Sequence, residues 1–211
     1  RPDGPVKSYI YDRATKKAQF LFVNNSKLEG QPLATMHAQV IKSRDGLDLV
    51  SYLTLPNGSD ADGNGRPDKP TPMVLLVHGG PWARDNFGYS GIHQMLANRG
   101  YGVLSVNFRG STGFGKNFLN AANKEWAGKM HDDLLDAVKW AVDQKVAPKD
   151  KIAIMGGSYG GYATLVGVTF TPDVFACGVS IVGPSNIVTL LNSIPPYWAP
   201  MIEMFASRVG D

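Results

Sequence analysis

One serine of the chain lies in a pattern that suits nucleophilic chemistry. Ser158 follows the short apolar run 152–155 and is flanked by Gly156 and Gly160, which gives the pattern G-x-S-x-G. Glycines permit a sharp turn here, because side chains at both positions would collide with the neighbouring strand and helix. A serine at the tip of such a turn can attack a carbonyl carbon. The alternative interpretation is a glycine-rich turn that carries an idle serine.

The residues around Ser158 predict a strand, a turn and a helix. The run 152–155 is typical of a buried strand, and residues 162–166 can form a helix. This context predicts the nucleophile elbow of an α/β-hydrolase fold. The backbone N–H of Tyr159 would then lie at a helix N-terminus, where it can stabilise an oxyanion. A second N–H is expected from the His-Gly-Gly-Pro loop at residues 78–81, which follows another apolar strand.

Strand-length apolar runs alternate with helical patterns along most of the chain. Strands are expected at residues 38–42, 47–55, 73–77, 102–108, 152–155 and 177–182, and helices at 90–100, 131–145 and 159–170. The later strands are continuously apolar, so they predict a doubly wound, mostly parallel sheet covered on both faces. From the first helix, Ile92, Met95 and Leu96 are expected to face the core. The lone Cys177 is expected to pack as a small buried hydrophobe.

The composition excludes several classes of function. Of the 211 residues 43% are hydrophobic, which is enough for one substantial core. The net charge is only +3 and no basic run exceeds Lys16-Lys17, so we expect neither nucleic acid nor an anionic membrane surface as a partner. The longest apolar runs are of strand length, so no transmembrane helix is expected. These features leave the cellular compartment open.

Residues 110–117 nearly match a phosphate-binding loop. They read Gly-Ser-Thr-Gly-Phe-Gly-Lys-Asn and follow an expected strand. However, Asn117 replaces the Ser or Thr whose hydroxyl binds magnesium in such loops. We therefore expect this segment to shape a pocket, and we expect no cofactor.

The loop between residues 56 and 72 carries part of a calcium-binding pattern. Oxygen-bearing side chains occupy positions 1, 3, 5 and 9 of that pattern, namely Asp60, Asp62, Asn64 and Asp68. Thr71 stands at position 12, where a calcium loop has a bidentate glutamate. We expect a flexible surface loop without a metal, and calcium binding is the alternative.

The order of the histidines does not fit a complete catalytic triad. In an α/β-hydrolase the acid and the histidine follow the serine along the chain. The histidines His37, His78, His93 and His131 all precede Ser158, and the acids Asp173, Glu203 and Asp211 follow it. Without a base, a serine hydroxyl is a weak nucleophile at neutral pH. We therefore expect the chain to stop before the strands that carry the acid and the base, and we interpret His37, His93 and His131 as core or turn residues.

Three motifs together resemble the prolyl oligopeptidase family of serine peptidases. They are His-Gly-Gly-Pro-Trp at residues 78–82, Asn-Phe-Arg-Gly-Ser-Thr-Gly-Phe-Gly at 107–115 and Gly-Gly-Ser-Tyr-Gly-Gly-Tyr at 156–162. The similarity is strongest to acylaminoacyl-peptidase and dipeptidyl-aminopeptidase-like members. It implies that residues 36–211 are the N-terminal part of an α/β-hydrolase catalytic domain, incomplete at the C-terminus. It also implies that residues 1–35, which include an expected hairpin, are the end of a preceding β-propeller module and its linker.

The resemblance implies roles for several residues. Ser158 is the nucleophile, and Tyr159 and Gly80 donate backbone N–H groups to the oxyanion. The residues implied for the substrate pocket are His78, Tyr162, Pro184, Ile187 and Leu190. The family's catalytic Asp and His match no position in the 211 residues.

The expected function is that of a serine peptidase that hydrolyses short peptides through an acyl-enzyme on Ser158. The 211 residues alone are expected to be inactive. A carboxylesterase on the same fold is one alternative, and a non-catalytic relative or fragment is another. An apolar sheet edge without a neighbouring strand favours self-association, or pairing with a C-terminal segment beyond residue 211.

Overall fold

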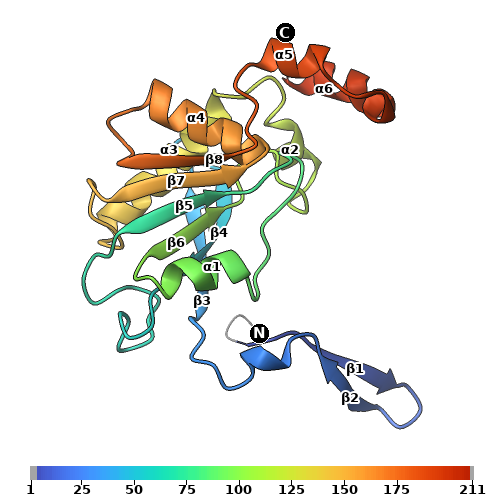
Figure 1. The fold of residues 1–211 in the computed structure, drawn as a ribbon, viewed down its shortest axis with the longest axis vertical. Helices are drawn as coiled ribbons and strands as arrows, with labels where there is room; N and C mark the ends of the chain where they lie inside the picture. The colour runs from blue at the N-terminus through green and yellow to red at the C-terminus, as the bar shows by residue number, and fades with distance from the viewer. Residues whose placement is uncertain (1–3, 210–211) are drawn as a thin grey trace.

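A six-stranded sheet forms the centre of the computed structural model, which describes residues 4–209 (Figure 1). The strand order is β3-β4-β6-β5-β7-β8. The strands are β3 (Met36–Lys42), β4 (Asp48–Thr54), β5 (Met73–Val77), β6 (Gly102–Val106), β7 (Ile152–Gly157) and β8 (Cys177–Ile181). Strands β6, β5, β7 and β8 run parallel, whereas β4 is antiparallel to both β6 and β3. The predicted, mostly parallel sheet is therefore confirmed.

The middle of the sheet is buried because the adjacent strands β6, β5 and β7 carry aliphatic residues in register. Leu75 of β5 pairs with Leu104 of β6 on one side and with Ile154 of β7 on the other. All three side chains are fully buried. Burial of each contributes about 1.5–3 kcal/mol relative to an exposed side chain, so this row stabilises the centre of the sheet.

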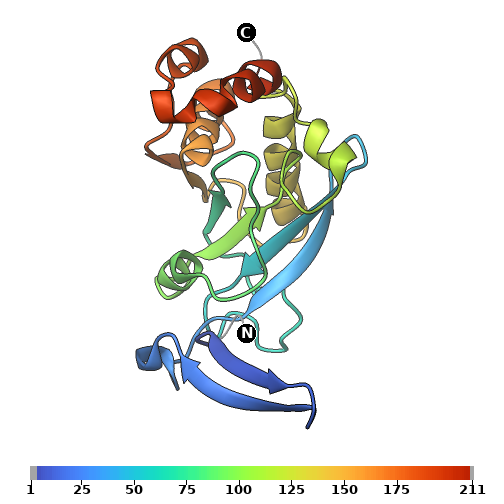
Figure 2. The ribbon, with the colours of Figure 1, turned by 90° about the vertical axis from the view of Figure 1, so that its right-hand side faces the viewer.

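Helices cover the two faces of the sheet. The helix α1 (Gly91–Ala97) lies on one side, and α3 (Lys129–Asp143) lies on the other (Figure 2). The helix α4 (Tyr159–Phe170) packs on β7 and β8 and also contacts α3. Shorter helices are η1 (Ser26–Leu28), α2 (Lys116–Asn120), α5 (Ile187–Asn192), η2 (Pro196–Met201) and α6 (Ile202–Val209). No helix within residues 4–209 is long and apolar enough to cross a membrane.

The face that α1 turns to the sheet differs from the prediction. The buried residues of α1 are His93 and Ala97, one turn apart, whereas Met95 is 43% exposed. The His93 ring lies between Thr54 Oγ1, 2.9 Å from Nδ1, and Ser105 Oγ, 2.8 Å from Nε2. The helix is thus oriented by a buried polar side chain, which a search for apolar periodicity overlooks. The predicted core role of His93 is confirmed.

The strand β8 is exposed, so the prediction that it is buried was wrong. Its only strand neighbour among residues 4–209 is β7, and every residue of β8 is exposed. Val179 and Ile181 are 47% and 45% exposed. Cys177, expected to be buried, is exposed for the same reason. An apolar strand pattern predicts burial only if the strand has neighbours on both sides, which the local sequence does not specify.

The first two strands form a hairpin apart from the main sheet (Figure 1). Strand β1 (Lys7–Asp12) pairs antiparallel with β2 (Lys17–Val23), which confirms the predicted hairpin. Aromatic side chains on it are half exposed or more, at Tyr9, Tyr11, Phe20 and Phe22. The assignment of residues 1–35 to the end of a β-propeller stays a prediction, and residues 1–3 lie outside the described part of the chain.

Candidate active site

Ser158 lies between the last residue of β7 and the first residue of α4. Its backbone has φ 56° and ψ −118°, a conformation that L-residues rarely adopt. The Ser158 N–H donates to the carbonyl oxygen of Ile181 at 2.9 Å, which fixes the turn. The side chain is exposed. The strained turn therefore presents the Ser158 hydroxyl at the carboxyl ends of the parallel strands, where α/β sheets carry their sites.

The glycines of the elbow are required by close backbone contacts. A Cβ at Gly160 would overlap the carbonyl oxygen of Val77, at the end of β5. A Cβ at Gly156 would lie 2.6 Å from the same oxygen and 2.5 Å from the Gly160 carbonyl. The elbow is thus pressed onto the end of the central strand, and the steric reason predicted for both glycines is confirmed.

The loop that follows β5 lies directly against the elbow. A Cβ at Gly79 would be 3.0 Å from the Gly157 carbonyl oxygen and 3.5 Å from Ser158 Cβ. Gly80 has φ 125°, and a Cβ there would lie 2.7 Å from the Trp82 nitrogen. Only glycine fits this backbone. The His-Gly-Gly-Pro loop and the Ser158 elbow, which the sequence predicts to act together, are therefore adjacent in the fold.

A cavity of about 450 Å³ opens at Ser158. Of the residues predicted for the site, Gly80, Ser158, Tyr159, Pro184 and Leu190 line it. The residues that the sequence prediction missed are Trp126, Val182, Gly183, Trp198 and Phe205. The walls are therefore largely apolar and aromatic, and they suit an uncharged side chain.

Three predicted pocket residues, His78, Tyr162 and Ile187, lie outside this lining. The Tyr162 ring packs behind the wall, with its centroid 5.3 Å from that of Trp126 and 6.0 Å from that of Tyr159. Ile187 is half-buried at the start of α5. The family resemblance implied a pocket role for Tyr162 and Ile187, and neither lines the cavity in this structure.

His78 supports the loop and does not face Ser158. Its Nδ1 is 2.8 Å from the Gly79 carbonyl oxygen, and its Nε2 is 2.9 Å from Ser111 Oγ. The ring stacks on Phe108 with centroids 4.4 Å apart, and burial lowers the pKa of His78. Both ring nitrogens are therefore engaged. Within residues 4–209, no side chain forms a hydrogen bond with the Ser158 hydroxyl.

Tyr159 anchors the elbow in the core through its side chain. The residue is only 3% exposed, and its ring contacts Phe108 at 5.3 Å and Trp126 at 4.7 Å between centroids. Burial raises the pKa of the Tyr159 hydroxyl well above its usual value, so this group stays protonated. The phenol thus fills space and holds the backbone N–H of Tyr159 in place beside Ser158.

The glycine-rich segment 110–117 packs against protein side chains. A Cβ at Gly113 would overlap the Arg84 guanidinium, which lies over the Phe114 ring at 4.5 Å. The helix that follows, α2, has five residues. The segment thus lies against the loop that follows β5, and its expected role in shaping a pocket stays a prediction.

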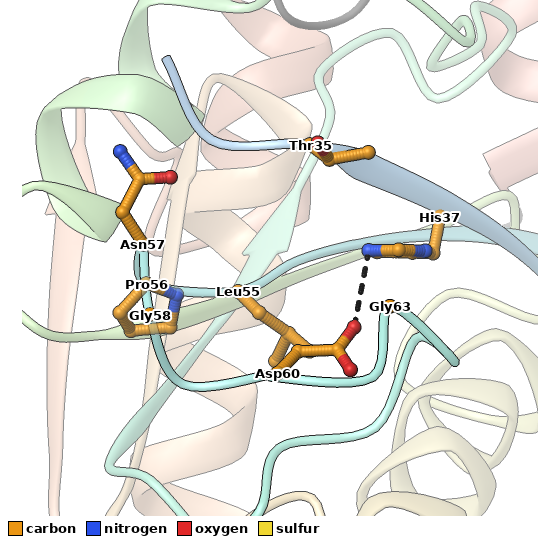
Figure 3. A pocket seen from close by; sticks show the side chains of 8 residues that line it. All are labelled: Thr35, His37, Leu55, Pro56, Asn57, Gly58, Asp60 and Gly63. Carbon is orange, nitrogen blue, oxygen red and sulfur yellow. Dashed lines mark ion pairs between the residues drawn. The ribbon is translucent and has the colours of Figure 1, made fainter. Parts of the chain in front are cut away.

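The acidic loop closes on itself beside a second, smaller cavity (Figure 3). The Asp60 carboxylate accepts hydrogen bonds from the N–H groups of Asn64 at 3.0 Å and Gly65 at 2.9 Å. It also faces His37, with 3.7 Å between Asp60 Oδ2 and His37 Nε2 (Figure 3). In the part of the chain that the structure describes, no three His, Cys, Asp or Glu side chains could together hold a metal ion. Calcium binding at this loop stays the alternative to the predicted metal-free loop.

Comparison with known proteins identifies close relatives. The model of the prolyl oligopeptidase family matches residues 87–202. The chain is 64% identical over 209 residues to dipeptidyl aminopeptidase BIII of Pseudoxanthomonas mexicana, covering 99% of this chain and 30% of that protein. It is 45% identical over 227 residues to dipeptidyl peptidase family member 6 of Caenorhabditis elegans, covering 99% and 31%. The chain thus spans less than a third of the length of these relatives.

A solved peptidase structure is also similar to this chain. A puromycin-hydrolyzing peptidase of Mycobacterium tuberculosis superposes with a TM-score of 0.86 at 27% identity. The match covers all of this chain and 31% of that one. The predicted α/β-hydrolase fold is therefore confirmed.

Proposed function

Because the chain belongs to the prolyl oligopeptidase family, we propose that it carries the nucleophile of a serine peptidase that cleaves short peptides. The observation that carries the proposal is Ser158 itself. Ser158 is exposed at a strained elbow and lines a largely apolar cavity. Gly80, from the loop after β5, lines the same cavity. The names of the relatives, dipeptidyl aminopeptidase and dipeptidyl peptidase, support a peptide as the substrate.

The proposed reaction begins when Ser158 Oγ attacks the carbonyl carbon of the peptide. The hydroxyl proton passes to a general base as the new C–O bond forms. The backbone N–H groups of Tyr159 and Gly80 donate hydrogen bonds to the oxyanion. The C–N bond then breaks, the amine leaves with the proton, and water hydrolyses the ester left on Ser158.

The general base is proposed to lie beyond these 211 residues. The histidines of the chain all precede Ser158, whereas the fold places the triad histidine after the serine. His78 is the histidine nearest in the fold, and both of its ring nitrogens already have partners. Residues 1–35 are proposed to belong to a preceding β-propeller, since their hairpin stands apart from the main sheet.

The lining of the cavity favours a substrate with an uncharged side chain on the residue whose carbonyl is attacked. Trp126, Trp198 and Phe205 supply aromatic walls, and no Lys, Arg, Asp or Glu is among the described residues that line the cavity. A charged side chain would lose its hydration there without a partner.

The test is hydrolysis by the longest product that the gene encodes. Matched peptide and ester substrates with the same acyl group separate a peptidase from an esterase. We expect turnover of the amide, loss of that turnover in Ser158→Ala, and unchanged turnover in Ser193→Ala, which alters an exposed serine. Turnover of the ester alone would favour the carboxylesterase, and turnover of neither would favour a non-catalytic relative.

A further inference from the structure

We propose that Trp126 is a specificity-determining residue that sets how large a side chain the cavity beside Ser158 admits. The inference rests on the proposed function and extends it to a residue that the family motifs in this sequence do not include. The implied residues that line the cavity, Pro184 and Leu190, follow β8, whereas Trp126 precedes Ser158, in the loop before α3.

The position of the Trp126 ring makes it a wall of the cavity. It lies edge-on to the Tyr159 ring, with 4.7 Å between centroids and planes inclined at 75°. It also contacts Tyr162. Tyr159 lines the same cavity and immediately follows the nucleophile. Because the residue is only half-buried, part of the indole remains available to a substrate side chain.

The backbone on both sides of Trp126 is constrained. Lys124 has φ 61° and Ala127 has φ 58°. This is the left-handed backbone conformation, which residues other than glycine rarely adopt. Glu125 joins the loop to α3, because its carboxylate accepts the N–H of Lys129 at 3.1 Å. Strained positions of this kind persist where surrounding contacts impose them. The loop therefore holds the indole in one place.

A second aromatic wall of the cavity is tied to the same loop. The Lys124 N–H donates to the carbonyl oxygen of Arg208 in α6, at 2.6 Å. The same helix supplies Phe205 to the cavity, where its ring lies edge-on to Trp82 at 5.2 Å. Trp126 and Phe205 thus come from distant parts of the chain, and the hydrogen bond between Lys124 and Arg208 links the two segments that carry them. A fixed separation between two aromatic walls limits the size of what fits between them.

The test measures kcat/KM on the longest gene product with peptides that differ only in the residue before the scissile bond. We expect Trp126→Ala to raise the ratio of kcat/KM for a Phe peptide to that for an Ala peptide by at least about 10-fold, mainly through KM. Trp126→Phe is expected to give an intermediate ratio. The matched control is Trp140→Ala, which alters a Trp that stacks with Arg66 away from the cavity and is expected to keep the wild-type ratio.

Other outcomes overturn the inference or the proposed function separately. Equal loss on all peptides, with the ratio unchanged, would show that Trp126 only stabilises the loop and would overturn the inference. If wild type hydrolyses no peptide in the series, the proposed function fails as well. If Trp126→Ala does not fold, as judged by its melting transition, the Phe-to-Ala ratio of kcat/KM is measured on Trp126→Leu and Trp126→Phe instead. A wild-type ratio in both of these variants overturns the inference.

Discussion

Ser158 keeps an unfavourable backbone conformation because its neighbours leave no room for another. Its N–H is bonded to Ile181, and the glycines at 156 and 160 are pressed against the end of β5. The buried Phe108 ring stacks on His78 and contacts the tilted Tyr159 ring, so one side chain supports both segments that carry the proposed oxyanion donors. At the residue scale the site is preorganised by sterics, and substitutions there act first on folding.

Gly160→Ala is expected to prevent or severely weaken folding. The new Cβ would overlap the Val77 carbonyl oxygen, a backbone atom that cannot move aside. We expect a loss of roughly 3 kcal/mol or more in the free energy of unfolding, measured by urea denaturation of the chain. The control is Gly91→Ala at the start of α1, where the nearest atom would be 3.9 Å away. Equal stabilities for the two variants would contradict the steric account.

His93 makes the fold sensitive to acid. Burial lowers the pKa of His93 to about 4, whereas the unfolded chain titrates near 6.5. Between these values the unfolded state binds the proton and the native state does not, so stability is lost as pH falls from about 6.5 towards 4. The full loss is roughly 3 kcal/mol. His93→Gln is expected to flatten the pH dependence of the melting temperature in this window, and an unchanged slope would argue against a neutral, buried His93.

At the scale of elements, Arg109 joins the loop after β6 to helix α3 and to the β3–β4 turn. Its guanidinium contacts Asp133 at 2.7 Å and Asp45 at 2.8 Å, and Asp133 is fully buried. The hydrogen bonds from Arg109 hold the pKa of Asp45 well below its usual value. One cation therefore joins three elements of the fold.

Removal of this cation is expected to destabilise the fold strongly. Arg109→Met leaves Asp133 buried without its cation, with the hydrogen bond from the backbone N–H of residue 109 still in place. Loss of one partner of a buried ion pair typically costs about 3–5 kcal/mol. The control is Lys139→Met, which breaks the exposed pair with Asp143 and is expected to cost less than about 1 kcal/mol. Urea denaturation of both variants gives the comparison, and a small loss for Arg109→Met would mean that Asp133 finds solvent or another donor.

The sequence predicted those elements whose own apolar residues follow a strand or helix pattern. Strands β5 and β7 are short apolar runs, and α3 repeats apolar residues at helical spacing, so their positions followed from the sequence. The exposure of β8 and the buried face of α1 depend on which neighbours pack there, and no local pattern encodes that. Trp126 was missed for a similar reason, because only the fold brings its loop beside Tyr159.

For the whole molecule, β8 is the edge most exposed to association. Its outer side has no partner strand among residues 4–209, and Val179 and Ile181 are nearly half exposed. An unpaired apolar edge is a template for another strand. The exposed hairpin β1–β2 adds further apolar surface at the other end of the chain (Figure 1).

We therefore expect the 211-residue chain to self-associate as its concentration rises, measured by light scattering. Val179→Lys places a charge on the β8 edge and is expected to reduce the association. Val188→Lys, on an exposed position of α5, is the matched control and is expected to leave it unchanged. A monomer at all concentrations would count against the exposed edge as an interface.

The central claim is that Ser158 is the nucleophile and that its base comes from beyond residue 211. The most direct measurement is labelling with a fluorophosphonate probe, followed by mass mapping, on the longest gene product and on the 211-residue chain. We predict a label on Ser158 in the longest product, none in Ser158→Ala, and labelling at least about 100-fold slower in the chain alone, because a general base is worth this much. Equally fast labelling of the chain alone, or no label on Ser158 in either, would contradict the claim.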